Sequence, residues 1–145
     1  MKALIQRVAM AKVVVDGEIV GAIETGLLVL LGVEKGDSET SATRMLDKLL
    51  AYRIFPDEQQ RMNRSVVEAG GGLLVVSQFT LAADTAKGLR PSFSSAAAPV
   101  EAEQLYEFML ASAREKHHTV ASGRFGADMK VHLINDGPVT FLLET

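Results

Sequence analysis

Two short segments carry the side chains best suited to chemistry, and the first of them is Ser77-Gln78-Phe79-Thr80-Leu81. Ser77 or Thr80 could act as a nucleophile if a general base lay beside it. The closest carboxylate in the sequence is Asp84, and no histidine lies nearby. The residues alone therefore favour the interpretation that both hydroxyls satisfy backbone groups where a buried strand ends.

The second segment is Asn135-Asp136-Gly137-Pro138-Val139-Thr140, in which two local signals conflict. Asp-Gly favours a type I′ hairpin turn. The following proline instead pushes Gly137 towards an extended conformation and removes a backbone donor. Such conflicts tend to mark functional or strained positions. A cis Gly137–Pro138 bond would reconcile the two signals, but X–Pro bonds are usually trans, so the sequence alone predicts trans.

The remaining residues indicate no metal and no cofactor. The sequence has no cysteine and no His-Glu-x-x-His or Gly-x-Ser-x-Gly pattern. His117 and His118 are neighbours near a predicted helix end, and their side chains point about 100° apart, so they cannot easily share a metal. The helix macrodipole favours cations at this end. Both histidines are interpreted as helix-end charge. His132 lies in an alternating strand and could be buried or exposed.

Length and composition predict one globular domain over residues 1–145. Hydrophobic residues make up 48% and charged residues 23% of the 145 residues. The net charge of −3 argues against a protein that grips a long nucleic acid, but it permits contact with the end of an RNA. Local pairs of cations, such as Lys87 with Arg90, are interpreted as ordinary solvated charges. The absence of a leader or a membrane-length apolar run predicts a cytoplasmic protein and no membrane contact.

Alternating and apolar runs predict a sheet. Asp16-Gly17 indicates a hairpin between the second and third of these strands, and strands joined by such short turns are expected to be antiparallel. The predicted strands are Lys2–Met10, Lys12–Asp16, Glu18–Ile23, Leu27–Val33, Leu73–Ser77, Met129–Ile134 and Val139–Leu143.

Helical spacing then predicts two helices. The first is capped by Asp37 or Ser38 and ends before Pro56, and the second begins at Pro99. The expected buried stripes are Ala42, Met45, Leu46, Leu49 and Arg53 in the first helix, and Leu105, Phe108, Met109 and Ser112 in the second. The long irregular stretch of residues 82–98 suits a functional loop. The predicted fold class is α+β, a single domain with a mainly antiparallel, curled, barrel-like sheet and two main helices.

Nearly the whole sequence resembles the D-aminoacyl-tRNA deacylase family. Ser77 to Leu81 and Asn135 to Thr140 match its two motifs, in the right order and without a departure. The similarity extends to Gln6-Arg7-Val8, to Gly88 through Phe93 and to Gly123 through Met129.

The resemblance implies hydrolysis of the ester that joins a D-amino acid, or glycine mischarged on tRNA(Ala), to the tRNA 3′ end. It also implies a homodimer with active sites at the interface, a cis Gly137–Pro138 bond, and no required metal. In such a site Gly137 and Pro138 of one subunit form a backbone wall in the pocket of the other, and Arg7 holds that segment.

The resemblance further assigns roles to side chains of the pocket. It makes Thr80 and Gln78 catalytic, with the Thr80 backbone N–H as oxyanion donor and its hydroxyl as an alternative nucleophile. The substrate-binding residues are Ser77, Phe79, Gly137, Pro138, Arg7, Phe125 and Met129. Three alternatives remain open: an acyl-ester hydrolase with a Thr80 or Ser77 nucleophile, a non-catalytic module that binds RNA ends, and a dimeric structural protein.

Overall fold

Strand β1 (Lys2–Val15) organises the sheet because it pairs antiparallel with three other strands. β3 (Gly26–Gly32) lies along its N-terminal half and β2 (Glu18–Ile23) along its C-terminal half. β8 (Lys130–Glu144) runs along its other edge. The computed structural model, which describes residues 1–145, thus shows β1 as one strand where two were predicted.

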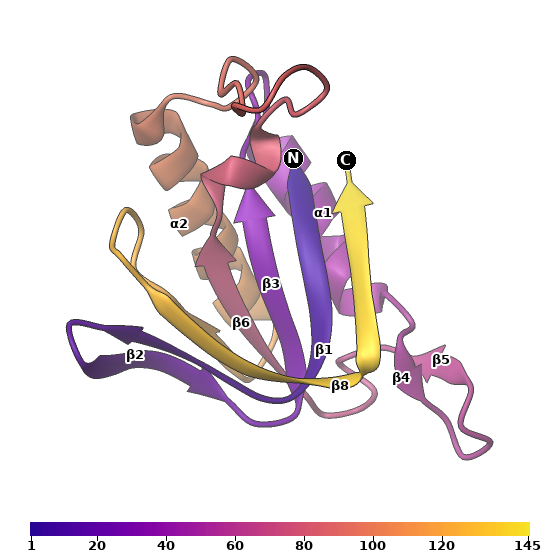
Figure 1. The fold of residues 1–145 in the computed structure, drawn as a ribbon. Coiled ribbons are helices and arrows are strands. Elements are labelled where there is room, and N and C mark those ends of the chain that lie inside the picture. The colour runs from indigo at the N-terminus through magenta and orange to yellow at the C-terminus, as the bar shows by residue number, and fades with distance from the viewer.

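The predicted hairpin at Asp16-Gly17 is confirmed. Both residues have positive φ angles, 49° and 80°, as a type I′ turn requires. The expectation that closely connected strands are antiparallel is wrong for β2 and β3, because both pair with β1 and not with each other. β1 bends between the half that pairs with β3 and the half that pairs with β2, and this bend gives the sheet its curl (Figure 1).

The other half of the sheet is parallel. β6 (Gly72–Ser77) pairs with β3, and β7 (Val120–Ser122) pairs with β6, both in parallel. A helix lies in each of the two crossovers, as parallel neighbours require. A separate small sheet joins β4 (Phe55–Pro56) to β5 (Met62–Arg64). The predicted α+β class with a curled sheet is confirmed, and the antiparallel pairs of the main sheet all involve β1.

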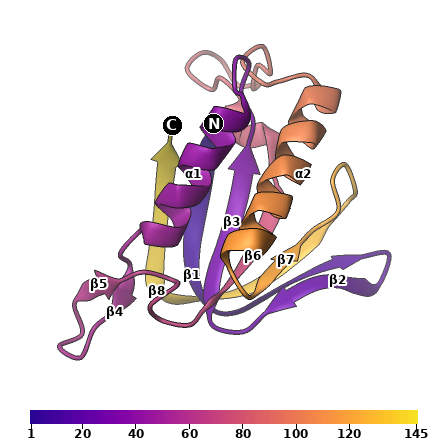
Figure 2. The same ribbon diagram turned by 180° about the vertical axis from the view of Figure 1, so that it is seen from behind.

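Two helices cover one face of the sheet (Figure 2). α1 (Glu39–Ala51) begins after Ser38, which forms a capping box with Ser41. α2 (Pro99–Lys116) begins with Pro99 in its first turn, as predicted. Neither helix is both long and apolar enough to cross a membrane.

The buried stripe of α1 is as predicted, except that Arg53 lies beyond the end of the helix and is exposed. The stripe predicted for α2 is out of phase, because only Met109 of its four members is fully buried. The fully buried residues of α2 are Ala102, Tyr106, Met109, Leu110 and Ala113. The error arose because small alanines, which carry little apolar signal, occupy two of the true core positions.

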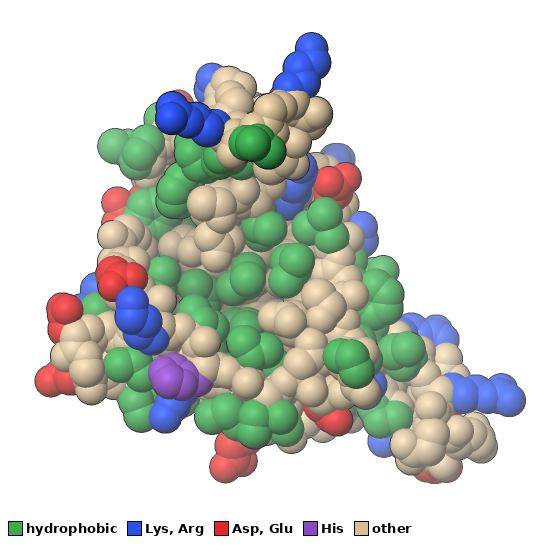
Figure 3. Space-filling model, in the orientation of Figure 1, with side chains coloured by type: hydrophobic (Ala, Val, Ile, Leu, Met, Phe, Trp, Pro, Cys, Tyr) green, Lys and Arg blue, Asp and Glu red, His purple; other side chains and the backbone are tan.

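The sheet face away from the helices is partly uncovered. Odd-numbered residues of β1 such as Ala3 and Ile5 belong to the core under the helices, so even-numbered neighbours face the other way. Leu4 lies directly opposite Leu30 and Leu142 in the adjacent strands. Leu142 is 52% exposed. Apolar side chains therefore run across this open face, as Figure 3 shows.

β8 corrects the prediction of two strands joined by a turn. Both of its halves pair with β1, so they follow one another along the same edge. Gln6 pairs with Thr140 and Val8 pairs with Asn135, so residues 136–139 of β8 lie opposite the single residue Arg7. Asp136-Gly137 is thus a bulge in a long bent strand and not a hairpin turn. Gly137–Pro138 is cis, so the trans prediction was wrong and the isomer implied by the family resemblance is present.

Candidate functional site

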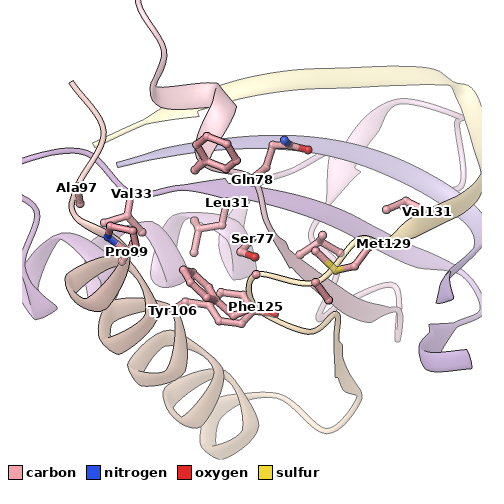
Figure 4. A pocket seen from close by; sticks show the side chains of 15 residues that line it. Leu31, Val33, Ser77, Gln78, Ala97, Pro99, Tyr106, Phe125, Met129 and Val131 are labelled. Carbon is pink, nitrogen blue, oxygen red and sulfur yellow. The ribbon is translucent and has the colours of Figure 1, made fainter. Parts of the chain in front are cut away.

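A cavity of about 440 Å³ opens where β6 ends, between the start of α2 and the loop that precedes β8 (Figure 4). Most of its lining is apolar. Five residues singled out from the sequence line it, namely Ser77, Gln78, Phe79, Phe125 and Met129. Thr80 does not line the cavity but lies beside it, in contact with Gln78. Arg7, Gly137 and Pro138 do not line it either and form a second group at the bulge of β8.

The end of β6 is fixed by the neighbouring strand. The Gln78 N–H donates to the Leu31 carbonyl at 2.8 Å, after which the chain turns into the short 3-10 helix η1 (Phe79–Ala82). Gly32 permits this turn, because a Cβ there would lie 2.9 Å from the Leu81 Cβ. The sequence thus places Ser77 and Gln78 at a defined strand end, the position in which functional side chains are often held.

The hydroxyls of this motif have no base beside them. Gln78 Nε2 donates to Thr80 Oγ1 at 2.5 Å, and an amide cannot accept a proton from a nucleophile. Thr80 is exposed, whereas the half-buried Ser77 turns its hydroxyl towards the cavity (Figure 4). No Asp, Glu, His, Lys or Arg lines the cavity. The arrangement can position a ligand and donate hydrogen bonds, but it offers no carboxylate, imidazole or amine as a base for a nucleophile.

Tyr106 is the one lining residue with an ionisable side chain, and it was missed from the sequence. Its hydroxyl donates to the Val75 carbonyl at 2.9 Å. Burial, followed by the nearby Glu107 carboxylate, raises the pKa of Tyr106 to about 12, so the phenol stays neutral at ordinary pH. Had the stripe of α2 been phased one residue later, Tyr106 would have been predicted to face the sheet.

The loop before β8 closes the other side of the cavity. Phe125 packs its ring against Tyr106, with the ring centroids 5.8 Å apart. Met129 Sδ accepts from the Arg124 N–H at 3.4 Å. Gly123 allows the sulfur this close, because a Cβ at that position would lie 2.6 Å from it. A ring contact therefore holds Phe125 at the wall, and a backbone N–H holds Met129 there.

Arg7 holds the Gly137–Pro138 segment in place. Its Nε donates to the Asp136 carbonyl at 2.9 Å, and its Nη1 donates to the Ile54 carbonyl at 2.7 Å. Asn135 supports the far side of the bulge, where its Oδ1 accepts from the Val139 N–H at 2.7 Å. The bulge is thus fixed at both ends, while Gly137 and Pro138 themselves are exposed.

The two groups of residues lie well apart within one chain. Ser77 pairs with Leu31, which in turn pairs with Ala3 of β1, whereas the bulge of β8 opposes Arg7. Four residues along β1 and three strand spacings across the sheet correspond to a separation of roughly 20 Å. One chain therefore does not bring its own Gly137–Pro138 segment to its own cavity.

His117 departs from the sequence interpretation as a solvated helix-end charge. It is buried, and its Nε2 lies 2.7 Å from the Gly71 carbonyl, which ties the end of α2 to the loop before β6. His118 is exposed, with its ring 4.7 Å from that of His117. His132 is exposed on β8. None of the three histidines lines the cavity.

The sequence and fold have clear relatives. Residues 4–144 match the family model for D-Tyr-tRNA(Tyr) deacylase. The chain belongs to this deacylase family. It is 66% identical over 145 residues to the D-aminoacyl-tRNA deacylase of Stutzerimonas stutzeri, with 100% of both chains covered. It is 63% identical, again over the full length of both chains, to the D-aminoacyl-tRNA deacylase of Pseudomonas aeruginosa strain LESB58.

Two solved structures share this fold. The solved structure of c-Myc DNA Unwinding Element Binding Protein superposes with a TM-score of 0.96 at 40% identity, covering 100% of this chain and 99% of the other. A probable eukaryotic D-amino acid tRNA deacylase superposes with a TM-score of 0.80 at 17% identity, covering 99% and 98%. The second likeness concerns the fold alone.

Proposed function

We propose that this protein hydrolyses the ester of D-aminoacyl-tRNA, and of glycine mischarged on tRNA(Ala), while a Gly137–Pro138 backbone wall excludes L-aminoacyl esters. The coarser statement rests on the family: the protein is a D-aminoacyl-tRNA deacylase, an ester hydrolase that acts on charged tRNA. The wall rests mainly on one observation, the exposed Gly137–Pro138 segment that Arg7 holds in place.

An uncharged cavity suits this reaction because an aminoacyl ester is already activated. The vicinal ribose 2′-OH can assist attack by water on the ester carbonyl, so the protein need only position the ester and stabilise the developing oxyanion. The bond from the carbonyl carbon to the ribose oxygen then breaks, and the ribose oxygen takes up a proton. We assign the Thr80 backbone N–H as oxyanion donor, with Gln78 positioning Thr80 through their side-chain hydrogen bond.

A second copy of the chain would complete the site. Gly137 and Pro138 are exposed and firmly held, yet they lie too far from the cavity of their own chain to reach it. The open sheet face presents Leu142 and its neighbours for association. Apolar surface of this kind is typical of subunit interfaces. In a two-fold dimer each copy would insert its bulge into the cavity of the other.

Rejection of L esters would then be a matter of space. A rigid backbone close to the α-carbon leaves room for hydrogen or a D side chain but collides with an L side chain. Exclusion by collision can discriminate more strongly than added attractive contacts. The bonds from Arg7 and Asn135 supply the rigidity that this mechanism needs. Phe125 and Met129 would form the opposite wall, with Phe79 near the terminal adenosine.

The alternative with a covalent acyl-enzyme has less support. It needs a base beside Thr80 or Ser77, and the side chain that contacts Thr80 Oγ1 is an amide donor.

Because the substrate is charged tRNA, we further propose that the protein acts in the cytoplasm, where charged tRNA is used.

The proposal is tested by timed deacylation of D-tyrosyl-tRNA and L-tyrosyl-tRNA by the purified protein. We expect rapid loss of the D ester with the L ester spared. Hydrolysis of both esters at similar rates would contradict the proposed backbone wall, although the protein would still be an esterase. Hydrolysis of neither by folded protein would contradict the catalytic assignment and favour a module that only binds RNA ends.

A further inference from the structure

Two phenylalanines form an exposed aromatic surface at the mouth of the cavity. Phe79, which lines the cavity, is 60% exposed, and Phe93 is 44% exposed. Their ring centroids lie 5.2 Å apart with an angle of 46° between the planes. Large aromatic side chains are rarely left in water as a pair unless something packs on them. The pair therefore extends the cavity outwards as a surface on which a flat ring could stack.

The loop that carries Phe93 has a defined shape. Asp84 and Ser92 exchange two backbone hydrogen bonds, of 2.8 and 3.0 Å, which close a small loop between them. The Asp84 carboxylate accepts from the Ala86 N–H at 2.9 Å. Beyond Ser92 the chain is tied to the sheet, because the Ala97 N–H donates to the Val33 carbonyl at 3.1 Å.

The tip of this loop presents two free cations. Lys87 and Arg90 are exposed, and neither takes part in any of the ion pairs of the structure. Asp84, the one acidic residue of the loop, already accepts a backbone hydrogen bond. Leu89 between the two cations is fully exposed, at 104%. The loop therefore carries two exposed cations within a few residues of the exposed Phe93 ring, and aromatic rings together with cations have the chemistry that single-stranded nucleic acid requires.

We propose that this patch, defined as Phe79, Lys87, Arg90 and Phe93, binds the single-stranded nucleotides that precede the terminal adenosine of the substrate. Phe93 extends the stacking surface beyond Phe79, and Lys87 with Arg90 contact phosphates of the approaching strand. This inference rests on the proposed function, because it takes the cavity as the place of the terminal adenosine and its ester. It also explains how a protein with net charge −3 holds a polyanion, since the cations concentrate where the strand enters.

The decisive experiment compares two esters that share the reacting bond. One is D-tyrosyl-tRNA, and the other is D-tyrosyl-adenosine, which lacks the preceding nucleotides. Lys87→Ser combined with Arg90→Ser should lower the ratio of kcat/KM for the tRNA ester to that for the adenosine ester by about tenfold at low salt. The slope of log kcat/KM against log salt for the tRNA ester should become shallower by roughly 1.4, as expected for two lost contacts to a single strand.

A matched control removes the same charge elsewhere. Arg44 on α1 and Arg114 on α2 are exposed and take part in none of the ion pairs, so Arg44→Ser combined with Arg114→Ser should leave the ratio unchanged. Phe93→Ser tests the stacking surface separately and should lower the ratio about tenfold, within the range that base stacking on aromatic side chains supports.

The outcomes separate the two proposals. An unchanged ratio in both the charge variant and Phe93→Ser, with wild-type activity on both esters, would overturn the nucleotide-binding patch and leave the proposed function standing. Equal losses on the two esters would also overturn it, because the loop would then only shape the cavity. A wild-type protein that hydrolyses neither ester would refute the proposed function itself.

Discussion

The cavity beside β6 and the bulge of β8 are opposite in construction. The cavity is a recess lined mostly by apolar side chains, with no charged group on its wall. The bulge exposes Gly137 and Pro138 and is held from behind by polar side chains, Arg7 and Asn135. One region offers space without a shape-selective group, and the other offers a rigid backbone edge without a recess. Neither forms a selective site by itself, which is why we propose that two copies combine them.

The largest expected effect comes from changing the bulge itself. In Gly137→Ala a Cβ would lie 2.6 Å from Val139 Cγ2 and 2.7 Å from the Val139 nitrogen, at a φ of +152°. The bulge must shift, so we expect D-tyrosyl-tRNA turnover to fall about 100-fold while the protein stays folded. Kinetics together with circular dichroism check this. Normal turnover in the folded variant would show that the bulge takes no part in the site.

A smaller loss is expected when the support of the bulge is weakened. Lysine in Arg7→Lys carries all its N–H donors on one nitrogen, so it cannot span the Asp136 and Ile54 carbonyls from two nitrogens as the guanidinium does. We expect a fall of about tenfold in kcat/KM for the D ester and a narrower D-over-L ratio. Arg64→Lys, at an exposed ion pair with Glu58, is the control. If both variants behaved like the wild type, Arg7 would not position the wall.

Thr80→Val tests whether the segment beside the cavity acts through the Thr80 backbone N–H. The substitution removes the hydroxyl that accepts from Gln78 Nε2 and keeps the Thr80 N–H. Catalysis by the backbone predicts a loss of less than about tenfold, the consequence of looser positioning. A nucleophilic hydroxyl predicts a loss of several orders of magnitude and an acyl-enzyme trapped in the wild type. Mass spectrometry of acid-quenched reactions distinguishes the two.

The smallest expected effect is on the pH dependence of folding stability, through Tyr106 in the cavity wall. Because the folded state raises the pKa of Tyr106 from 10.0 to about 12, the unfolded state loses this proton first, and stability falls as pH rises between those values. Tyr106→Phe should cost about 1 kcal/mol at neutral pH, since Val75 keeps the Gly123 N–H as a donor. Its stability should decline less than that of the wild type above pH 10. Urea unfolding at several pH values measures both, and parallel curves would contradict the account.

Local sequence signals fixed the elements well where neighbouring residues decide their structure. The Asp16-Gly17 turn, the Ser38 cap and Pro99 at the start of α2 follow from backbone preferences, and all were predicted. Where distant strands decide, prediction failed. β8 was divided at Asp136-Gly137 because nothing local indicates that both halves pair with β1.

The candidate site was only half accessible to sequence reasoning. Ser77, Gln78 and Phe79 stood out as a polar motif after an apolar run, but Tyr106 lay hidden in a helix whose core positions are partly alanine. The buried contact of His117 with Gly71 depends on where the end of α2 meets the loop before β6, and no spacing along the chain reports that. The importance of Arg7 came from the family resemblance alone.

The most direct test of the central claim is complementation between two defective variants. Gly137→Ala damages the bulge, and Ser77→Leu fills the cavity, so each purified variant alone should be nearly inactive on D-tyrosyl-tRNA. After the two are mixed, unfolded and refolded together, half of the dimers would be mixed, and each mixed dimer would hold one intact pair of cavity and bulge. We predict recovery of about a quarter of wild-type activity, carried by a species of twice the monomer mass. No recovery, from mixed dimers shown to have formed, would contradict a site shared between two copies.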